Sequence, residues 1–277
     1  MMPVLLILIV GISIYTLTLP GAIDGLIYYV KPDFNQFSIK TVIAAVGQLF
    51  YSMSLAMGIM ITYGSYMRKE DNIESSVRQI EVFDTLVAFL SGLIIVPAVF
   101  VFSGGDENAL NAGPSLMFIT LPNVFKEMLG GQIVGAVFFL LVVLAAMTSS
   151  ISLMETVVSI VEERFHWKRI PSCLIVTGIS FLIGLLSVFG YSIWSDFTIF
   201  HMQFLDFFDY ISNNIMMPIV ALMTCVLVGF VVKTTFVEDE IEKNTRFRAK
   251  GLYRVMIKFI CPICMLLILF SALFLKL

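Results

Sequence analysis

The sequence predicts an all-α protein that crosses a membrane several times. Of its 277 residues, 59% are hydrophobic and only 13% are charged, and the mean hydropathy is +0.97, whereas soluble domains carry about 25% charged residues. Seven stretches are apolar enough and near the roughly 20 residues that a helix needs to span a bilayer. They are 3–20, 41–67, 82–103, 132–160, 170–194, 207–232 and 254–275. The first has no basic residues before it and continues into further spans, so we predict a span rather than a signal peptide.

The distribution of basic residues predicts which ends of the spans face the cytoplasm. If the first residue is cytoplasmic and the C-terminus extracellular, 13 of the 17 Lys and Arg residues fall in cytoplasmic loops. Lys31, Lys40, Lys126 and Lys276 then lie outside. Basic residues near helix ends are retained in the cytoplasm, so we predict this orientation.

One outside loop carries an apolar segment of its own. Glycine and proline punctuate residues 104–130, and the apolar part of this loop, 115–128, is too short to cross a bilayer. Segments of this kind fold back at the membrane surface. We therefore expect an extracellular lid at 104–130, within a single transmembrane domain that covers residues 1–277.

The second span has polar residues at its centre. It is long for one helix, and Ser52, Ser54 and Gly58 interrupt its apolar character. A helix that breaks near 52–58 would explain both features, because an unwound turn frees carbonyl groups to bind a cation. Alternatively, the two serines bond to carbonyls four residues earlier in an unbroken helix. Both interpretations remain open from these residues alone.

Polar groups also occur in the third and fourth spans. Asp84 lies near the cytoplasmic start of the third, where it either reaches the interface or binds a cation. Residues 148–150 place three hydroxyls midway along the fourth, where small residues allow close helix packing but also suit an ion that prefers oxygen. Glu155, about two turns further on, needs a partner or water at that depth.

The sixth span differs from the others at both its start and its centre. Asp206 and Asp209 open its outer end, as a solvated terminus or an extracellular gate, and Pro218 predicts a kink.

We find none of the common motifs of hydrolytic or phosphate-binding enzymes in this sequence. It contains no HExxH, no GxSxG and no glycine-rich phosphate loop. Cys261 and Cys264 have the spacing of a zinc or redox pair, but no second pair or nearby His completes a site. We therefore expect neither an enzyme nor a resident cofactor.

The polar segments resemble the neurotransmitter:sodium symporter family, especially its bacterial amino-acid transporters. Residues 47–58 (GQLFYSMSLAMG) with 61–66 (ITYGSY) resemble the sixth helix of that family. Further matches occur in the family's order over essentially the whole chain. They are 2–3 and 17–22 for the fifth helix and the residues after it, 84–88 with 91–92 for the seventh, 113–114 with 119–122 for the extracellular lid, and 145–151 for the eighth.

The resemblance implies a transporter fold of two inverted repeats with a discontinuous helix. The family's first four helices would then precede Met1, and the chain would end after a helix that resembles the eleventh. The expected function is sodium-coupled symport of a neutral amino acid, apolar or aromatic, across the bacterial plasma (inner) membrane. The alternative is a non-transporting fragment, or a half that requires a separate N-terminal partner chain. Sodium is the coupling ion and no cofactor is expected. An amino acid, sodium and the lipid bilayer are the expected partners, without nucleic acid or chloride.

The resemblance also assigns residues, position by position. It implies that Ser52 and Asp84 bind the first sodium ion, and that the Ala145 carbonyl with the Thr148 and Ser149 hydroxyls binds the second. The positions that match the amino-acid pocket are Tyr51, Ser52, Ser54, Met57, Ser149 and Leu153. Gln48 and Asp209 match the extracellular gate, whose arginine belongs to the family's first helix.

Three positions depart from the common pattern of the family. Asp84 replaces an asparagine of many members. Ala56 stands where relatives often have glycine, which narrows the pocket slightly. Ala88 stands where animal members have a chloride-binding serine, so we expect chloride independence, with the charge of Asp84 as compensation.

Overall fold

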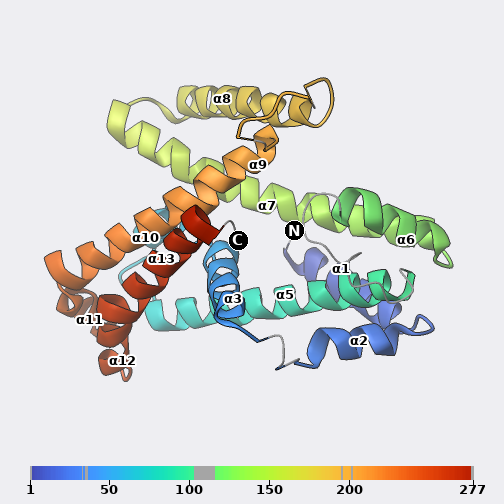
Figure 1. Cartoon of the computed structure of the whole chain (residues 1–277). Helices are drawn as coiled ribbons and strands as arrows, with labels where there is room; N and C mark the ends of the chain where they lie inside the picture. Colours follow the sequence, from blue (N-terminus) through green and yellow to red (C-terminus); the bar gives the residue numbers. More distant parts are fainter. Residues whose placement is uncertain are drawn as a thin grey trace. The chain divides into compact units, whose positions relative to one another are not determined.

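The computed structural model describes residues 2–32, 34, 37–102, 116–194, 196–200 and 202–275, and most of these are helical (Figure 1). The α-helices are α1 (Met2–Leu17), α2 (Ala22–Val30), α3 (Ile39–Ser52), α4 (Ile59–Ser65), α5 (Ile73–Phe102), α6 (Leu121–Glu127), α7 (Gly131–Phe165), α8 (Arg169–Gly190), α9 (Phe204–Asp209), α10 (Met217–Val226), α11 (Thr234–Glu242), α12 (Lys250–Val255) and α13 (Cys261–Phe270). The π-helical segments are η2 (Leu116–Thr120), η3 (Tyr210–Met216), η4 (Leu227–Val231), η5 (Met256–Ile260) and η6 (Ser271–Leu275). The predicted all-α class is confirmed.

Within the described residues, five continuous helical stretches are long and apolar enough to cross a membrane. They are Ile73–Val101, Gly131–Phe165, Arg169–Gly190, Phe204–Val231 and Lys250–Leu273. Pro3–Leu17 and Ala22–Val30 form a further candidate span that bends by 116°. The stretch for which one span over 41–67 was predicted consists of α3 and α4 with a break between them.

The predicted lid lies only partly within the described residues. Residues 104–115, with the Gly113-Pro114 pair, lie outside them. From Leu116 onward the segment forms η2 and α6, followed by a short turn that leads into α7.

The chain divides into two compact units. Unit 1 comprises Met1–Phe37 and Gln79–Ser150, and unit 2 comprises Ser38–Arg78 and Ile151–Leu277. The two longest helices, α5 and α7, therefore contribute residues to both units.

Unit 1 has an apolar core to which α1, α5, α6 and α7 contribute. Its buried members are Leu5, Ile9, Ile12, Ile94, Ala98, Val99, Leu121, Val124, Phe125, Met128, Phe138 and Leu141. The buried Ser13 hydroxyl of α1 donates to the carbonyls of Ile9 (2.7 Å) and Leu90 (3.1 Å), the second of which belongs to α5. The hydroxyl has one proton, which the two carbonyls share, so the polar group is satisfied within the apolar core.

Unit 2 is built around the pair α10 and α13, which pack along each other, while α13 also packs against α3. At one end of the pair the Tyr210 hydroxyl donates to the carbonyl of Ala272 (3.2 Å). At the other, Gly229 of η4 lies against Ile257 and Lys258 of η5.

Proline explains three of the π-helical segments. Pro122, Pro218 and Pro262 each occupy the second position of the α-helix that follows η2, η3 or η5. Proline has no N–H group, and its ring clashes with the carbonyl four residues earlier. Wider π-helical turns in the preceding segment make room for the ring. At Pro218, where we predict a kink, the segment before the proline is the π-helical η3.

Candidate functional site

The break between α3 and α4 is an irregular segment in a helical part of the chain. A capping box in which Ser38 and Thr41 bond each other's backbone begins α3 at Ile39, and the helix continues to Ser52. The next helical residue is Ile59. The N–H groups of Met53, Ser54 and Leu55 still bond back to carbonyls of α3, after which the helical pattern ends.

Left-handed backbone conformations produce this break. Ser54, Ala56 and Gly58 have φ angles of 53°, 63° and 81°. Residues with positive φ cannot continue a right-handed helix, so the carbonyl ladder of α3 is interrupted. Gly58 also has no room for a side chain, since a Cβ there would lie 2.9 Å from the Thr156 methyl group of α7.

Most of the predicted substrate and gate residues lie along this stretch of unit 2. Gln48, Tyr51 and Ser52 occupy the last turns of α3, and Ser54 and Met57 lie within the break itself. Tyr51 is exposed, whereas the others from Ser52 to Met57 are half-buried.

Two further predicted residues of unit 2 lie on other helices. Leu153 lies on α7 and is exposed. Asp209 is the last residue of α9, and its carboxylate accepts a hydrogen bond from the Asn213 amide at 2.5 Å. The side chain that ends α9 is therefore tied to the following turn, η3.

The predicted ligands of unit 1 lie on α5 and α7. Asp84 belongs to α5 and is half-buried. On α7, the Thr148 hydroxyl donates to the carbonyl of Ala145 at 2.8 Å, and Ser149 follows as the next residue, exposed. This turn contains a carbonyl and two hydroxyl oxygens, which are the type of hard ligand that a small cation prefers.

A polar network that sequence reasoning captured only in part joins α4, α7 and α8. The Tyr63 hydroxyl donates to the Ser152 hydroxyl at 2.7 Å, and the Tyr66 hydroxyl donates to the Glu155 carboxylate at 2.7 Å. Arg169, at the start of α8, donates to the other oxygen of Glu155 at 2.6 Å. The partner that Glu155 was predicted to need is thus a pair of donors.

One sequence signal could have located the tyrosines of this network. Tyr63 and Tyr66 are three residues apart, so they share a helix face, as do Ser152 and Glu155 on α7. The arrangement fastens α4 to α7 by side-chain hydrogen bonds rather than by apolar packing alone.

Comparisons with known proteins agree with these motifs. The model of the sodium:neurotransmitter symporter family matches residues 1–276. An uncharacterized sodium-dependent transporter of Haemophilus influenzae is 35% identical over 279 residues, which cover 99% of this chain and 59% of that protein. The uncharacterized sodium-dependent transporter YhdH of Bacillus subtilis is 29% identical, with 97% and 59% covered. A sodium-dependent nutrient amino acid transporter of Drosophila grimshawi is 26% identical, with 91% and 39% covered.

A solved structure extends the likeness to the fold. The crystal structure of MhsT in complex with L-phenylalanine superposes with a TM-score of 0.85 at 32% sequence identity. The match covers 98% of this chain and 61% of that one, which confirms the predicted transporter fold. The chain thus spans about 59% of the length of the first two relatives.

The family consists of transporters, as predicted, and not of enzymes. Because its model matches nearly the whole sequence, the chain belongs to the sodium:neurotransmitter symporter family.

Proposed function

We propose that this protein takes part in sodium-coupled symport of a neutral amino acid, apolar or aromatic, across the plasma membrane. The break between α3 and α4 carries this proposal, because it interrupts a helix of the membrane region and frees backbone groups there. The L-phenylalanine bound to MhsT and the description of the Drosophila grimshawi relative support an amino acid as the substrate.

The proposed substrate site centres on the broken helix. Unwound backbone at 53–58 has carbonyl oxygens that can accept hydrogen bonds from the ammonium group of an amino acid. Side chains of the break, the end of α3 and α7 would then enclose the apolar part. These residues are Tyr51, Ser52, Ser54, Met57, Ser149 and Leu153.

The proposed sodium ligands are oxygen atoms, as a hard cation requires. By their match to the family's motifs, Ser52 and Asp84 are assigned to one ion, and Ala145, Thr148 and Ser149 to the other. The Thr148 hydroxyl donates to the Ala145 carbonyl at 2.8 Å, and both groups carry oxygen atoms of the kind that a hard cation binds. The carboxylate of Asp84 supplies a negative charge to balance an ion in a medium of low dielectric constant.

Coupling follows if ions and substrate share sites that only one side of the membrane can reach at a time. Sodium then enters down its gradient together with the amino acid. Gln48 and Asp209 are assigned to closure of the extracellular side. The bonds of Tyr66 to Glu155, and of Glu155 to Arg169, would hold α4 against α7 at the cytoplasmic side. In this orientation the N-terminus is cytoplasmic as well. With Ala88 at the family's chloride position, we propose that transport needs no chloride.

A second proposal concerns the chain by itself. Since it spans 59% of its two bacterial relatives, the chain would be inactive alone and would need a further polypeptide segment for transport. Further membrane spans encoded directly upstream of the Met1 codon would identify one source of such a segment.

Binding of radiolabelled phenylalanine by the purified chain separates the two proposals. Saturable binding that requires sodium would support the first and overturn the second. Binding that appears only when the products of the upstream DNA are co-expressed would support both the transport role and the need for a further segment. Equal binding in sodium and choline in both preparations would overturn the transport proposal.

A further inference from the structure

The last third of unit 2 contacts both halves of the broken helix. On one side of the break, α13 packs against α3. On the other, the Asn244 amide, just beyond α11, donates to the carbonyls of Lys69 at 2.7 Å and Asp71 at 2.9 Å. Both carbonyls belong to the turn that follows α4.

We propose that residues 234–270, here called the C-terminal bracket, hold α3 and α4 in position across the break, with Asn244 as the positioning residue at the α4 end. The inference rests on the proposed function in one respect, because it assigns the bracket to the segment that would bind substrate. The bracket itself is a structural claim and can be tested without transport.

The turn after α4 is ordered by its own hydrogen bonds and presents two backbone carbonyls to the Asn244 amide. The backbone N–H of Arg68 donates to the Asp71 carboxylate at 2.7 Å, and the N–H of Asp71 donates to the Arg68 carbonyl at 3.0 Å. Asn72 then caps α5 by accepting from the N–H of Ser75 at 3.0 Å. These bonds use the turn's own donors, and the carbonyls of Lys69 and Asp71 accept from Asn244, which supplies two N–H groups.

Ion pairs between α11 and α12 fix the segment that carries Asn244. The Arg254 guanidinium of α12 donates through two nitrogens to the two oxygens of Glu238 in α11, each at 2.7 Å. The Glu238 side chain is only 3% exposed, and a bidentate pair of this kind fixes direction as well as distance. Lys250 pairs with Glu242 at 2.6 Å one turn closer to Asn244. The hairpin of α11 and α12 therefore has a defined register.

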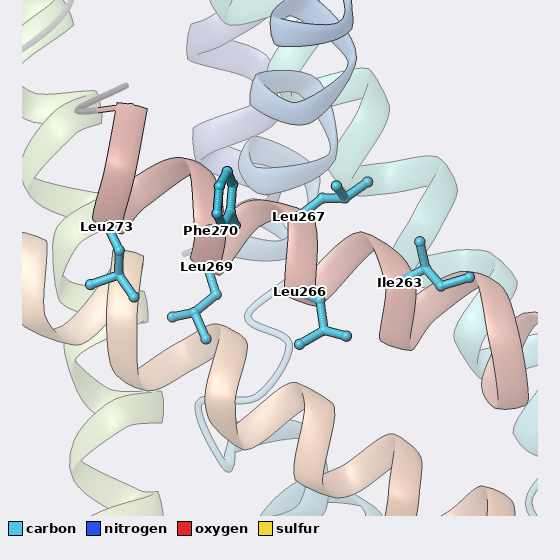
Figure 2. A pocket seen from close by; sticks show the side chains of 6 residues that line it. All are labelled: Ile263, Leu266, Leu267, Leu269, Phe270 and Leu273. Carbon is cyan, nitrogen blue, oxygen red and sulfur yellow. The ribbon is translucent and has the colours of Figure 1, made fainter.

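The other end of the bracket is apolar. Leu267 and Phe270 project from one side of α13 and Leu266 and Leu269 from the other (Figure 2). α13, with apolar side chains on both sides, packs against both α3 and α10.

The helix α4 depends on such external supports. It has only seven residues, so it has few backbone hydrogen bonds of its own. Besides its buried residues Ile59 and Thr62, it is held by the bonds of Tyr63 and Tyr66 to α7 and by the Asn244 contact with the turn after it. Loss of the last of these should loosen α4 and, through Gly58, the unwound residues that precede it.

Hydrogen–deuterium exchange of the purified chain in detergent micelles tests this inference. We expect Asn244→Ala to accelerate exchange of the amides at 53–58 by about threefold to tenfold, as the loss of one or two hydrogen bonds of local stability predicts. The matched control is Lys243→Ala, because Lys243 pairs with Glu240 on the same exposed turn. This control should leave exchange at 53–58 unchanged.

A second variant tests whether the effect of the first arises from misfolding. Asn244→Asp keeps the shape of the side chain but removes both N–H donors, so it should accelerate exchange at 53–58 as well. If either variant matches Lys243→Ala at these amides, even with faster exchange in the turn 66–72, the bracket is refuted. Because exchange is measured without sodium or substrate, this result is independent of phenylalanine binding by the unaltered chain, which tests the proposed function alone.

Discussion

Replacing Ala56 by glycine should stabilise the protein, although alanine-to-glycine changes in helices normally destabilise. Ala56 has a φ of 63°, and a left-handed conformation costs an L-residue about 1–2 kcal/mol. Glycine removes that cost but adds about 0.5–1 kcal/mol of unfolded-state entropy. The net gain is about 0.5–1 kcal/mol, or roughly 1–4 °C in the midpoint of thermal unfolding.

Thermal unfolding in detergent, followed by the loss of helical circular dichroism, measures the effect. Ala45→Gly is the matched control, because Ala45 is an exposed residue inside the regular helix α3. That change should cost about 1 kcal/mol and lower the midpoint. The reasoning is wrong if Ala56→Gly lowers the midpoint as Ala45→Gly does, since alanine would then be unstrained at the break.

Other perturbations have effects of predictable sign. Sodium-dependent uptake should be unchanged when gluconate replaces chloride, and collapse of uptake would contradict the proposed chloride independence. Arg254 holds the pKa of Glu238 below its usual value, chiefly by hydrogen bonding. A carboxyl whose pKa is lowered in the folded state stabilises the fold at pH values above its unfolded-state pKa. Glu238→Gln should therefore lower the free energy of unfolding by about 1–3 kcal/mol at pH 7. This difference should shrink as the pH falls below about 4.3, and a constant difference in thermal midpoint would exclude the ion pair as its source. Gly131→Ala should destabilise by about 1–3 kcal/mol, because its Cβ would collide with the Phe125 carbonyl oxygen. Gly184→Ala, where no described atom lies within 4 Å of the added Cβ, should not lower the midpoint.

Composition and local motifs predicted the helical class and the family, because both leave a dense signal in the sequence. A low charged fraction and runs of apolar residues identify membrane helices without any knowledge of packing. The break was harder to predict, since Ser52 and Ser54 are compatible with both a continuous and a broken helix. Alanine at position 56 gives no sign of a left-handed φ, which only the folded chain imposes.

Most of the contacts that the motifs did not predict join residues that are distant in sequence. Glu155 was recognisable as an acid in need of a partner, and Arg169 is near enough along the chain to be inferred. Tyr66, which bonds the same carboxylate, is 89 residues away, and its contact depends on how α4 and α7 pack. The same holds for Asn244, whose backbone acceptors carry no sequence signature.

The prolines show an intermediate case. Pro218 predicted an irregularity in its helix, because proline cannot donate to the carbonyl four residues earlier. Whether the helix kinks or widens depends on the neighbours that pack against it. Here Tyr210, the first residue of η3, bonds to η6, and the wider π-helical turn is the form that the chain adopts.

Uptake of radiolabelled phenylalanine tests the central claim most directly. The chain would be expressed in bacterial cells together with the DNA that flanks its gene, and uptake would be compared in sodium and choline buffers. The account predicts uptake that requires sodium and that falls at least about tenfold with Thr148→Ala, because a lost charge-bound ligand is worth about 1.5–3 kcal/mol. Uptake that is absent, or equal in sodium and choline, would contradict it.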